Sequence, residues 1–285
     1  MSRIRPVVKW VGGKTKIMKE IVGGAPTEYN NYFEPFLGGG SVFLNMPFTK
    51  KAIINDTNRD VINIYKKIKQ DPRKLALKLS RLEKAYNVLG NDRDKQNDLY
   101  KLNKRRLNKI KVYNFQRAAL YIFINKTCFN GIMYENSRGE ITATTGFHKK
   151  VKLYDLKNFL LLSKKLKKVT IKNTDYEKAV ANIQSGDFLY LDPPYVPDDG
   201  TKWDRKYGKK NTAWKEADHE RFFGFVDKMT LRGVKILMSN SDSAKIRKRY
   251  KKNKFYKYKR IPIKRTVAGK GYARGIKYEA LISNY

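Results

Sequence analysis

The chain has 285 residues, of which 63 are Lys or Arg and 26 are Asp or Glu, so its formal net charge is +37. With 41% hydrophobic residues, it can form one large domain or one domain with a substantial insertion. One cysteine and two histidines exclude a disulfide framework and a metal site, and we expect Cys128 to be a packed thiol. Because no signal peptide or transmembrane run is recognisable, we expect a cytoplasmic protein with access to nucleic acid, on the nucleoid or in a virus-infected host cell.

The positive charge predicts a polyanionic partner, since a codon bias towards Lys, Asn and Tyr does not explain the shortage of acidic residues. The charge is also uneven. Residues 61–150 carry 21 basic and 7 acidic residues, a net +14, and residues 241–285 carry 15 and 2, a net +13. We expect nucleic-acid phosphates to lie along these two stretches, and salt to weaken the binding steeply.

Apolar runs alternate with helical periodicity along the chain, which is typical of α/β architecture. In chain order we predict a strand at 31–36, a helix from Ser41, a strand at 52–55, a helix over 61–68, a helix opened by Asp71 and Pro72, and a buried helix at 115–124. Residues 125–150 show turn chemistry and no period, so we predict a loop and a hairpin. There follow a strand at 169–172, a helix from Asp175, strands at 188–191 and 234–238 with a helix from Ala217 between them, a basic helix at 244–252, and strands at 255–263 and 278–283.

The tetrapeptide Asp192-Pro193-Pro194-Tyr195 follows the apolar run 188–191, which predicts a strand buried on both faces. Open α/β sheets bind ligands at the carboxyl edge of such strands. Both prolines lack an N–H and have a fixed φ, so their carbonyls act only as rigid acceptors. A carboxylate, rigid acceptors and an aromatic ring suit a planar guest with an exocyclic amine, such as a nucleobase. The alternative is a strand terminator with a surface tyrosine.

A glycine turn at Gly38-Gly39-Gly40 separates the first strand from its helix, where bare backbone can approach a ligand closely. Position 43 is Phe, so the turn departs from the dinucleotide spacing G-x-G-x-x-G. Asp56 ends the next strand, where an acidic group can meet a ribose hydroxyl. Together with Asp192, these features outline an adenosine pocket along one sheet edge.

These motifs, in this order, resemble the Dam-type DNA adenine-N6 methyltransferases of the D12 class, in which the glycine motif precedes Asp-Pro-Pro-Tyr. The resemblance spans nearly the whole chain, and the matching segments are 9–14 (KWVGGK), 33–45 (FEPFLGGGSVFLN), 55–58 (NDTN), 125–140 around CFNG, 192–195 (DPPY), Ser239-Asn240 and 279–285 (EALISNY). It implies a Rossmann-like methyltransferase sheet, with residues 1–59 and 160–285 as the catalytic domain. Residues 60–159 would form an inserted, mainly helical target-recognition domain.

The resemblance implies S-adenosyl-L-methionine as cofactor and double-stranded DNA as substrate. The cofactor would lie among residues matched to the family's motifs: Trp10, Lys14, Phe36, Gly38, Gly40, Asp56 and Asp192. The target adenine would leave the duplex and stack on Tyr195. Asp192 and the Pro193 carbonyl would accept hydrogen bonds from its N6 amine, with Pro194 completing the catalytic tetrapeptide.

Relatives that methylate adenine in GATC match the chain around 125–146, which makes GATC or a related, relaxed site our expectation. By this match Lys9, Phe129, Asn130 and Ile132 would contact DNA. Those relatives usually carry an arginine where this chain has Tyr134, and a tyrosine cannot form the two parallel hydrogen bonds by which arginine reads guanine. For Arg138, base readout, phosphate contact and solvation all remain open.

Two other functions stay open at this point: an RNA adenine-N6 methyltransferase, and a DNA-binding relative that has lost catalysis. The insertion and the amino-terminal lysine motif favour DNA, and the intact tetrapeptide and glycine turn favour activity. We expect a monomer that binds no metal and no membrane. A role in restriction-modification, as a solitary enzyme or in a virus stays open as well.

Overall fold

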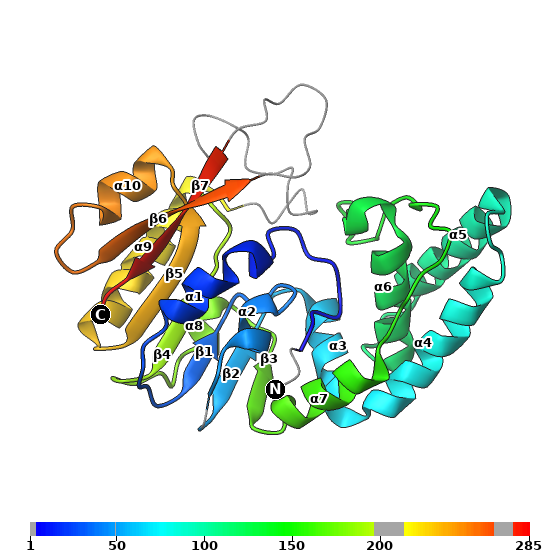
Figure 1. Cartoon of the computed structure of the whole chain (residues 1–285), viewed down its shortest axis with the longest axis horizontal. Coiled ribbons are helices and arrows are strands. Elements are labelled where there is room, and N and C mark those ends of the chain that lie inside the picture. Colours follow the sequence, from blue (N-terminus) through cyan, green and yellow to red (C-terminus); the bar gives the residue numbers. More distant parts are fainter. Residues whose placement is uncertain (1–3, 49, 197–213, 265–275) are drawn as a thin grey trace.

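The computed structural model describes residues 4–48, 50–196, 214–264 and 276–285, and a mixed sheet runs through this part of the chain (Figure 1). The sheet order is β3-β2-β1-β4-β5-β7-β6. The strands are β1 (Tyr32–Glu34), β2 (Ala52–Asn55), β3 (Val169–Lys172), β4 (Phe188–Leu191), β5 (Lys235–Ser241), β6 (Lys257–Lys264) and β7 (Ile276–Ser283). Strands β1 to β5 pair in parallel, and β7 lies antiparallel between β5 and β6. The order reverses between β1 and β4, which marks the position where such sheets bind ligands.

Both faces of the sheet are covered, as the unbroken apolar character of β4 predicts. All four residues of β4 are buried. Phe188 and Tyr190 join one apolar cluster and Leu189 and Leu191 the other, because side chains alternate along a strand. The elements that cover the first face are α1 (Met18–Gly23), α2 (Ser41–Asn45), α3 (Arg59–Gln70) and α7 (Leu156–Leu166). The second face packs against α8 (Tyr176–Ala179), α9 (Glu216–Leu231) and α10 (Ala244–Tyr250).

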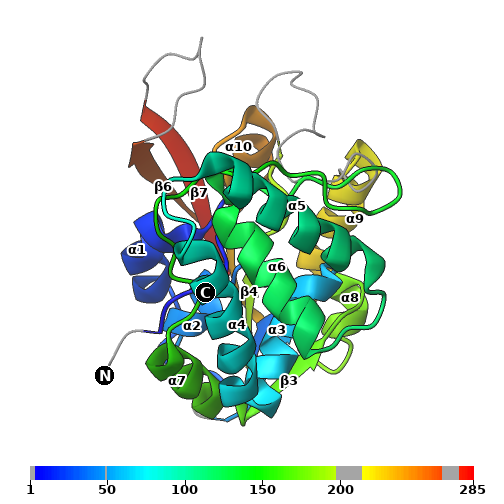
Figure 2. The same ribbon diagram turned by 90° about the vertical axis from the view of Figure 1, so that its right-hand side faces the viewer.

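Three long helices gather beside the sheet and not on it: α4 (Pro72–Asn87), α5 (Arg93–Lys109) and α6 (Phe115–Thr127) (Figures 1 and 2). Helix α6 is their core, since residues 118–125 are all buried, and it contacts α3, α4 and α5. Helices α3 and α7 contact both β3 and α4, so they connect this helical group to the sheet. Among the described residues, no helix is long and apolar enough to cross a membrane.

The predicted strands at 52–55, 169–172 and 188–191 are confirmed residue for residue. The first strand is shorter than predicted and ends at Glu34, because Pro35 has no N–H for a ladder hydrogen bond. Helices α1, α5 and α7 were not predicted. The buried stripe of α5 includes the polar side chains of Gln96 and Asn103, which hide the helical spacing of its apolar residues.

Candidate active site

The glycine turn and the tetrapeptide lie at the carboxyl ends of adjacent strands, β1 and β4. Gly38 and Gly40 have φ values of +50° and +76°, a left-handed conformation that favours glycine. A Cβ atom at Gly38 would lie 2.6 Å from Nε1 of Trp10, so the indole packs directly against the turn. The structure therefore brings together three of the predicted cofactor residues, Trp10, Gly38 and Gly40, at the switch point, where the strand order reverses between β1 and β4.

Asp56 connects the end of β2 to this turn. Its Oδ2 accepts a hydrogen bond from the Gly38 amide at 2.7 Å, and its Oδ1 accepts one from the Asn58 amide at 2.8 Å. The Asn173 side chain, after β3, donates to the Asp56 carbonyl at 2.6 Å. The carboxylate thus holds the glycine backbone in place at the sheet edge, next to the end of β3.

Asp192 forms an ion pair with Lys14, whose Nζ lies 2.8 Å from Asp192 Oδ2. The lysine side chain is only 4% exposed and that of Asp192 is 23% exposed. Ser239, in β5, donates to Asp192 Oδ1 at 3.1 Å and also contacts the Tyr190 hydroxyl at 2.9 Å. Burial raises the pKa of Asp192, while Lys14 and Ser239 oppose this shift because they stabilise the charged form.

Tyr195 is held from two sides. Its hydroxyl donates to Glu279 Oε2 in β7 at 2.9 Å, and Lys14 Nζ lies 4.8 Å from the centre of its ring. Pro193 is buried and Pro194 half-buried, so the tetrapeptide keeps a fixed path along the edge. Ser239 and Glu279 belong to the segments that carry the family resemblance, but nothing in the sequence assigned them a role beside Asp192 and Tyr195.

The predicted cofactor residue Phe36 lies in an aromatic cluster. Its ring centre is 5.2 Å from that of Tyr176, 5.7 Å from that of Trp214 and 5.9 Å from that of Phe222.

Glu34, at the end of β1, is fully enclosed and accepts a hydrogen bond from the Tyr32 hydroxyl. Burial raises the pKa of Glu34 to about 8.

The predicted DNA residues gather in a loop between α6 and α7. The Asn125 side chain bonds the Lys9 amide and carbonyl at 2.7 and 2.9 Å and the Gly131 carbonyl at 3.2 Å, which joins Lys9 to this loop. Phe129 is 62% exposed, and Asn130 has a φ of +53°. Isolated bridges pair Cys128 with Thr145 and Glu135 with Ile141, as expected for a loop with a hairpin. Ile132 is half-buried, whereas Tyr134 and Arg138 are exposed.

Cys128 is buried as predicted, and burial raises the pKa of its thiol to about 11, so it is a poor nucleophile. Within the described ranges, no three His, Cys, Asp or Glu side chains come together in a way that could hold a metal ion.

The sheet order and the position of the site are those of a Rossmann-like methyltransferase fold. The family model for the D12 class of N6 adenine-specific DNA methyltransferases matches residues 10–267, and the chain belongs to this family. Family membership selects DNA over the RNA alternative.

Similar proteins span the full length of the chain. Type II methyltransferase M.MjaIII of Methanocaldococcus jannaschii is 35% identical and is covered over 99% of both chains. Type II methyltransferase M1.LlaDCHI of Lactococcus lactis subsp. cremoris is 32% identical over 99% of this chain and 96% of its own. DNA adenine methylase of Escherichia coli strain K12 is 26% identical over 100% of this chain and 96% of its own.

Proposed function

We propose that this adenine-specific DNA methyltransferase uses S-adenosyl-L-methionine to methylate N6 of an adenine flipped out of duplex DNA. One observation carries the proposal: the Asp192 carboxylate lies at the sheet's switch point, held by Lys14 and Ser239 next to the Tyr195 ring. Bare glycine backbone and two acidic strand ends at the same edge fit an adenosine with a cationic tail.

The cofactor, when bound, supplies an electrophilic methyl group. We assign its surroundings to Trp10, Lys14, Phe36, Gly38, Gly40, Asp56 and Asp192. In the flipped adenine, the N6 amine would donate hydrogen bonds to Asp192 and the Pro193 carbonyl, which frees the nitrogen lone pair from conjugation with the ring. The nitrogen would lose one proton after it has received the methyl group. Stacking on Tyr195 would fix the plane of the base. Catalysis then comes from positioning and electrostatics, and no covalent adduct with Cys128 is required.

For the DNA, we propose that residues 60–159 form the target-recognition insertion and that Lys9, Phe129, Asn130 and Ile132 lie near the evicted base. GATC is the proposed target because of the match around residues 125–146. A related, relaxed site is the alternative, because Tyr134 lacks the guanidinium fork for guanine. Arg138 is exposed on the same hairpin and is available to a phosphate. We propose that the enzyme acts as a monomer in the cytoplasm.

The test is long-read mapping of modified bases in DNA from cells that lack their own adenine methylation and express the protein. We expect N6-methyladenine at one short recurring site. The Asp192→Ala variant should leave no methyladenine, whereas Cys128→Ala should still methylate. Normal methylation by Asp192→Ala would overturn the assigned role of the carboxylate, and modification of cytosine would overturn the proposed chemistry.

A further inference from the structure

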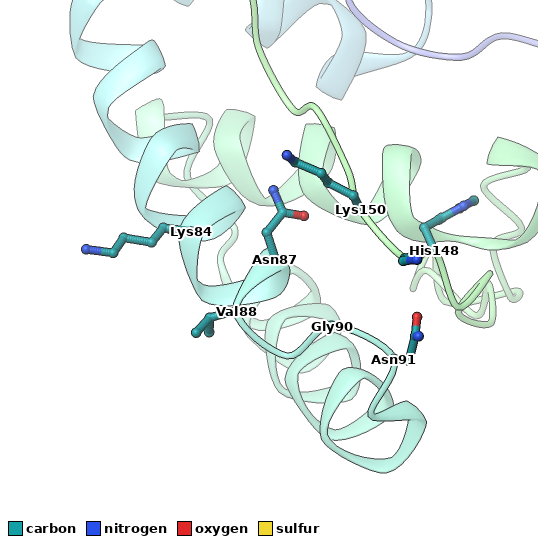
Figure 3. Close-up of a pocket in the computed structure, with 8 residues that line it drawn as sticks. Lys84, Asn87, Val88, Gly90, Asn91, His148 and Lys150 are labelled. Atoms are coloured by element: carbon teal, nitrogen blue, oxygen red, sulfur yellow. The ribbon is translucent and has the colours of Figure 1, made fainter.

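Two neighbouring pockets share His148 and Lys150 as lining residues, and we call them together the basic groove. The larger, about 870 Å³, lies between the end of α4 and the segment around His148 (Figure 3). The smaller, about 320 Å³, lies between this segment, Lys126 and the amino-terminal segment. His148 and Lys150 line both pockets. The lysines that line this basic groove are Lys9, Lys84, Lys126, Lys149, Lys150 and Lys152, and no acidic residue lines either pocket.

The groove has a fixed wall, because residues 148–153 are attached to α4 by side-chain hydrogen bonds. Asn87 bonds both the amide and the carbonyl of Val151, at 2.8 and 2.9 Å. The Tyr86 hydroxyl accepts from the His148 amide at 3.1 Å, and Glu83 accepts from the Leu153 amide at 2.6 Å. Val151 and Leu153 are buried while Lys150 and Lys152 are exposed, so the two lysines share the outer side of this segment.

Positive charge is concentrated inside the groove. Burial lowers the pKa of Lys126 to about 8. The negative charges of Glu83 and Asp155 oppose this shift, while the like charges of Lys9 and Lys152 add to it. The acceptor that Lys126 Nζ contacts is a neutral carbonyl, that of Lys152, at 3.3 Å. An anion in the groove would therefore relieve repulsion between these ammonium groups.

The groove also begins at the proposed target loop. Lys9 lies at one end of the groove, and its side chain packs against Gly131, where an added Cβ would lie 2.5 Å from Lys9 Cδ. The pocket beside Lys9 is also lined by Lys126 and Lys150, and Lys150 lines the pocket at the end of α4 as well. No Phe, Tyr or Trp lines either pocket, so the groove offers no surface for stacking unpaired bases.

We propose that the basic groove holds the phosphate backbone of duplex DNA flanking the methylation site. The inference rests on the proposed function, in which duplex DNA is the substrate. Lysines contact phosphates without reading the sequence, so the groove lengthens the footprint and orients the target loop without changing the recognised site. The lack of aromatic side chains favours a duplex over a single strand.

The test compares Lys150→Gln/Lys152→Gln with a control, Lys178→Gln/Lys228→Gln, which removes two exposed lysines from α8 and α9. Affinity is measured over a salt series for two duplexes, one ending at the methylation site and one with long flanks. On the flanked duplex, the plot of log K against log salt should be less steep for the groove variant, by about 1 for each lysine lost. The control should keep the wild-type slope, and on the short duplex all three proteins should agree.

Unchanged salt dependence of the groove variant on the flanked duplex would overturn the inference and leave the proposed function intact. An equal loss of salt dependence on both duplexes would also overturn the inference, because the lysines would then contact the methylation site itself. If the wild-type protein bound neither duplex, the proposed function would fail together with the inference. Circular dichroism of both variants checks that the exposed substitutions leave the fold unchanged.

Discussion

At the residue scale, the pairing of Lys14 with Asp192 determines the charge of the proposed acceptor for the target amine. Asp192 accepts hydrogen bonds from an amine most strongly as a carboxylate, and burial favours its neutral form by raising its pKa. The Lys14 ammonium, 2.8 Å away, favours the charged form. The acid limb of the enzyme's pH profile therefore depends on this lysine.

Lys14→Gln should move that acid limb to higher pH. Activity is lost as the pH falls through the pKa of Asp192, and loss of the opposite charge of Lys14 raises that pKa further. The measurement is kcat/KM for methyl transfer as a function of pH. Lys19→Gln, an exposed substitution in α1, is the control and should keep the wild-type limb. An unmoved limb in Lys14→Gln would contradict this electrostatic role.

Glu279 is expected to act through the hydroxyl of Tyr195, which it holds at 2.9 Å. Tyr195→Phe should weaken base capture about ten- to a hundredfold, since a hydrogen bond to a charged group contributes about 1.5–3 kcal/mol. Glu279→Gln should weaken it less, because the amide oxygen can still accept the hydrogen bond. If Glu279 acts through this hydroxyl, the double variant should be no worse than Tyr195→Phe alone. Base eversion is followed with 2-aminopurine at the target position, alongside turnover.

The control cycle combines Glu279→Gln with Tyr285→Phe. The Tyr285 hydroxyl donates to the Gly24 carbonyl at 2.6 Å, a different hydrogen bond from the one under test. These two changes should add. Additive losses for Tyr195→Phe and Glu279→Gln would show that Glu279 does not position the ring.

At the scale of elements, the turn after β1 owes its shape to close packing as well as to backbone conformation. Tyr65, buried in α3, donates from its hydroxyl to the Gly39 carbonyl at 3.0 Å. A Cβ atom at Gly40 would run into that hydroxyl. The turn thus depends on a helix that leads into the insertion.

Gly40→Ala should destabilise the protein by about 2–5 kcal/mol, the sum of left-handed strain of about 1–2 kcal/mol and overpacking of about 1–3 kcal/mol. Gly139→Ala is a matched control: Gly139 has a φ of +74°, close to the +76° of Gly40, and nothing lies within 4 Å of its added Cβ. It should show the strain alone. Urea unfolding measures the free energy of unfolding of both variants. Equal losses of stability would rule out the Tyr65 contact as a cause.

At the scale of the whole molecule, cofactor binding and base capture should be separable. At a cofactor concentration of 100 times Kd, binding should stabilise the folded protein by about 2.7 kcal/mol. Thermal unfolding should therefore shift to higher temperature on addition of S-adenosyl-L-methionine. Tyr195→Ala should keep this shift while losing turnover, because its proposed partner is the base. A wild-type protein with no shift would contradict the cofactor assignment.

Much of the sheet edge was predictable because its signals are local. The run Phe188–Leu191 is apolar throughout, and a strand buried on both faces requires this pattern. The turn around Gly38 and Gly40 follows from the tolerance of glycine for positive φ. Helix α5 was not predictable by the same means, since its buried Gln96 is satisfied by Tyr86 at 3.1 Å, a partner in another helix.

The sequence by itself determined the α/β class, the family resemblance and the residue types at the proposed site, because strand burial, turns and motif order are properties of neighbouring residues. Only the tertiary structure decided which distant groups meet. Lys14 reaches Asp192 because the short helix Lys14–Ile17 packs beside α2, and Glu279 reaches Tyr195 because β7 pairs with β5. Such contacts depend on packing between elements, and the local pattern along the chain carries no record of it.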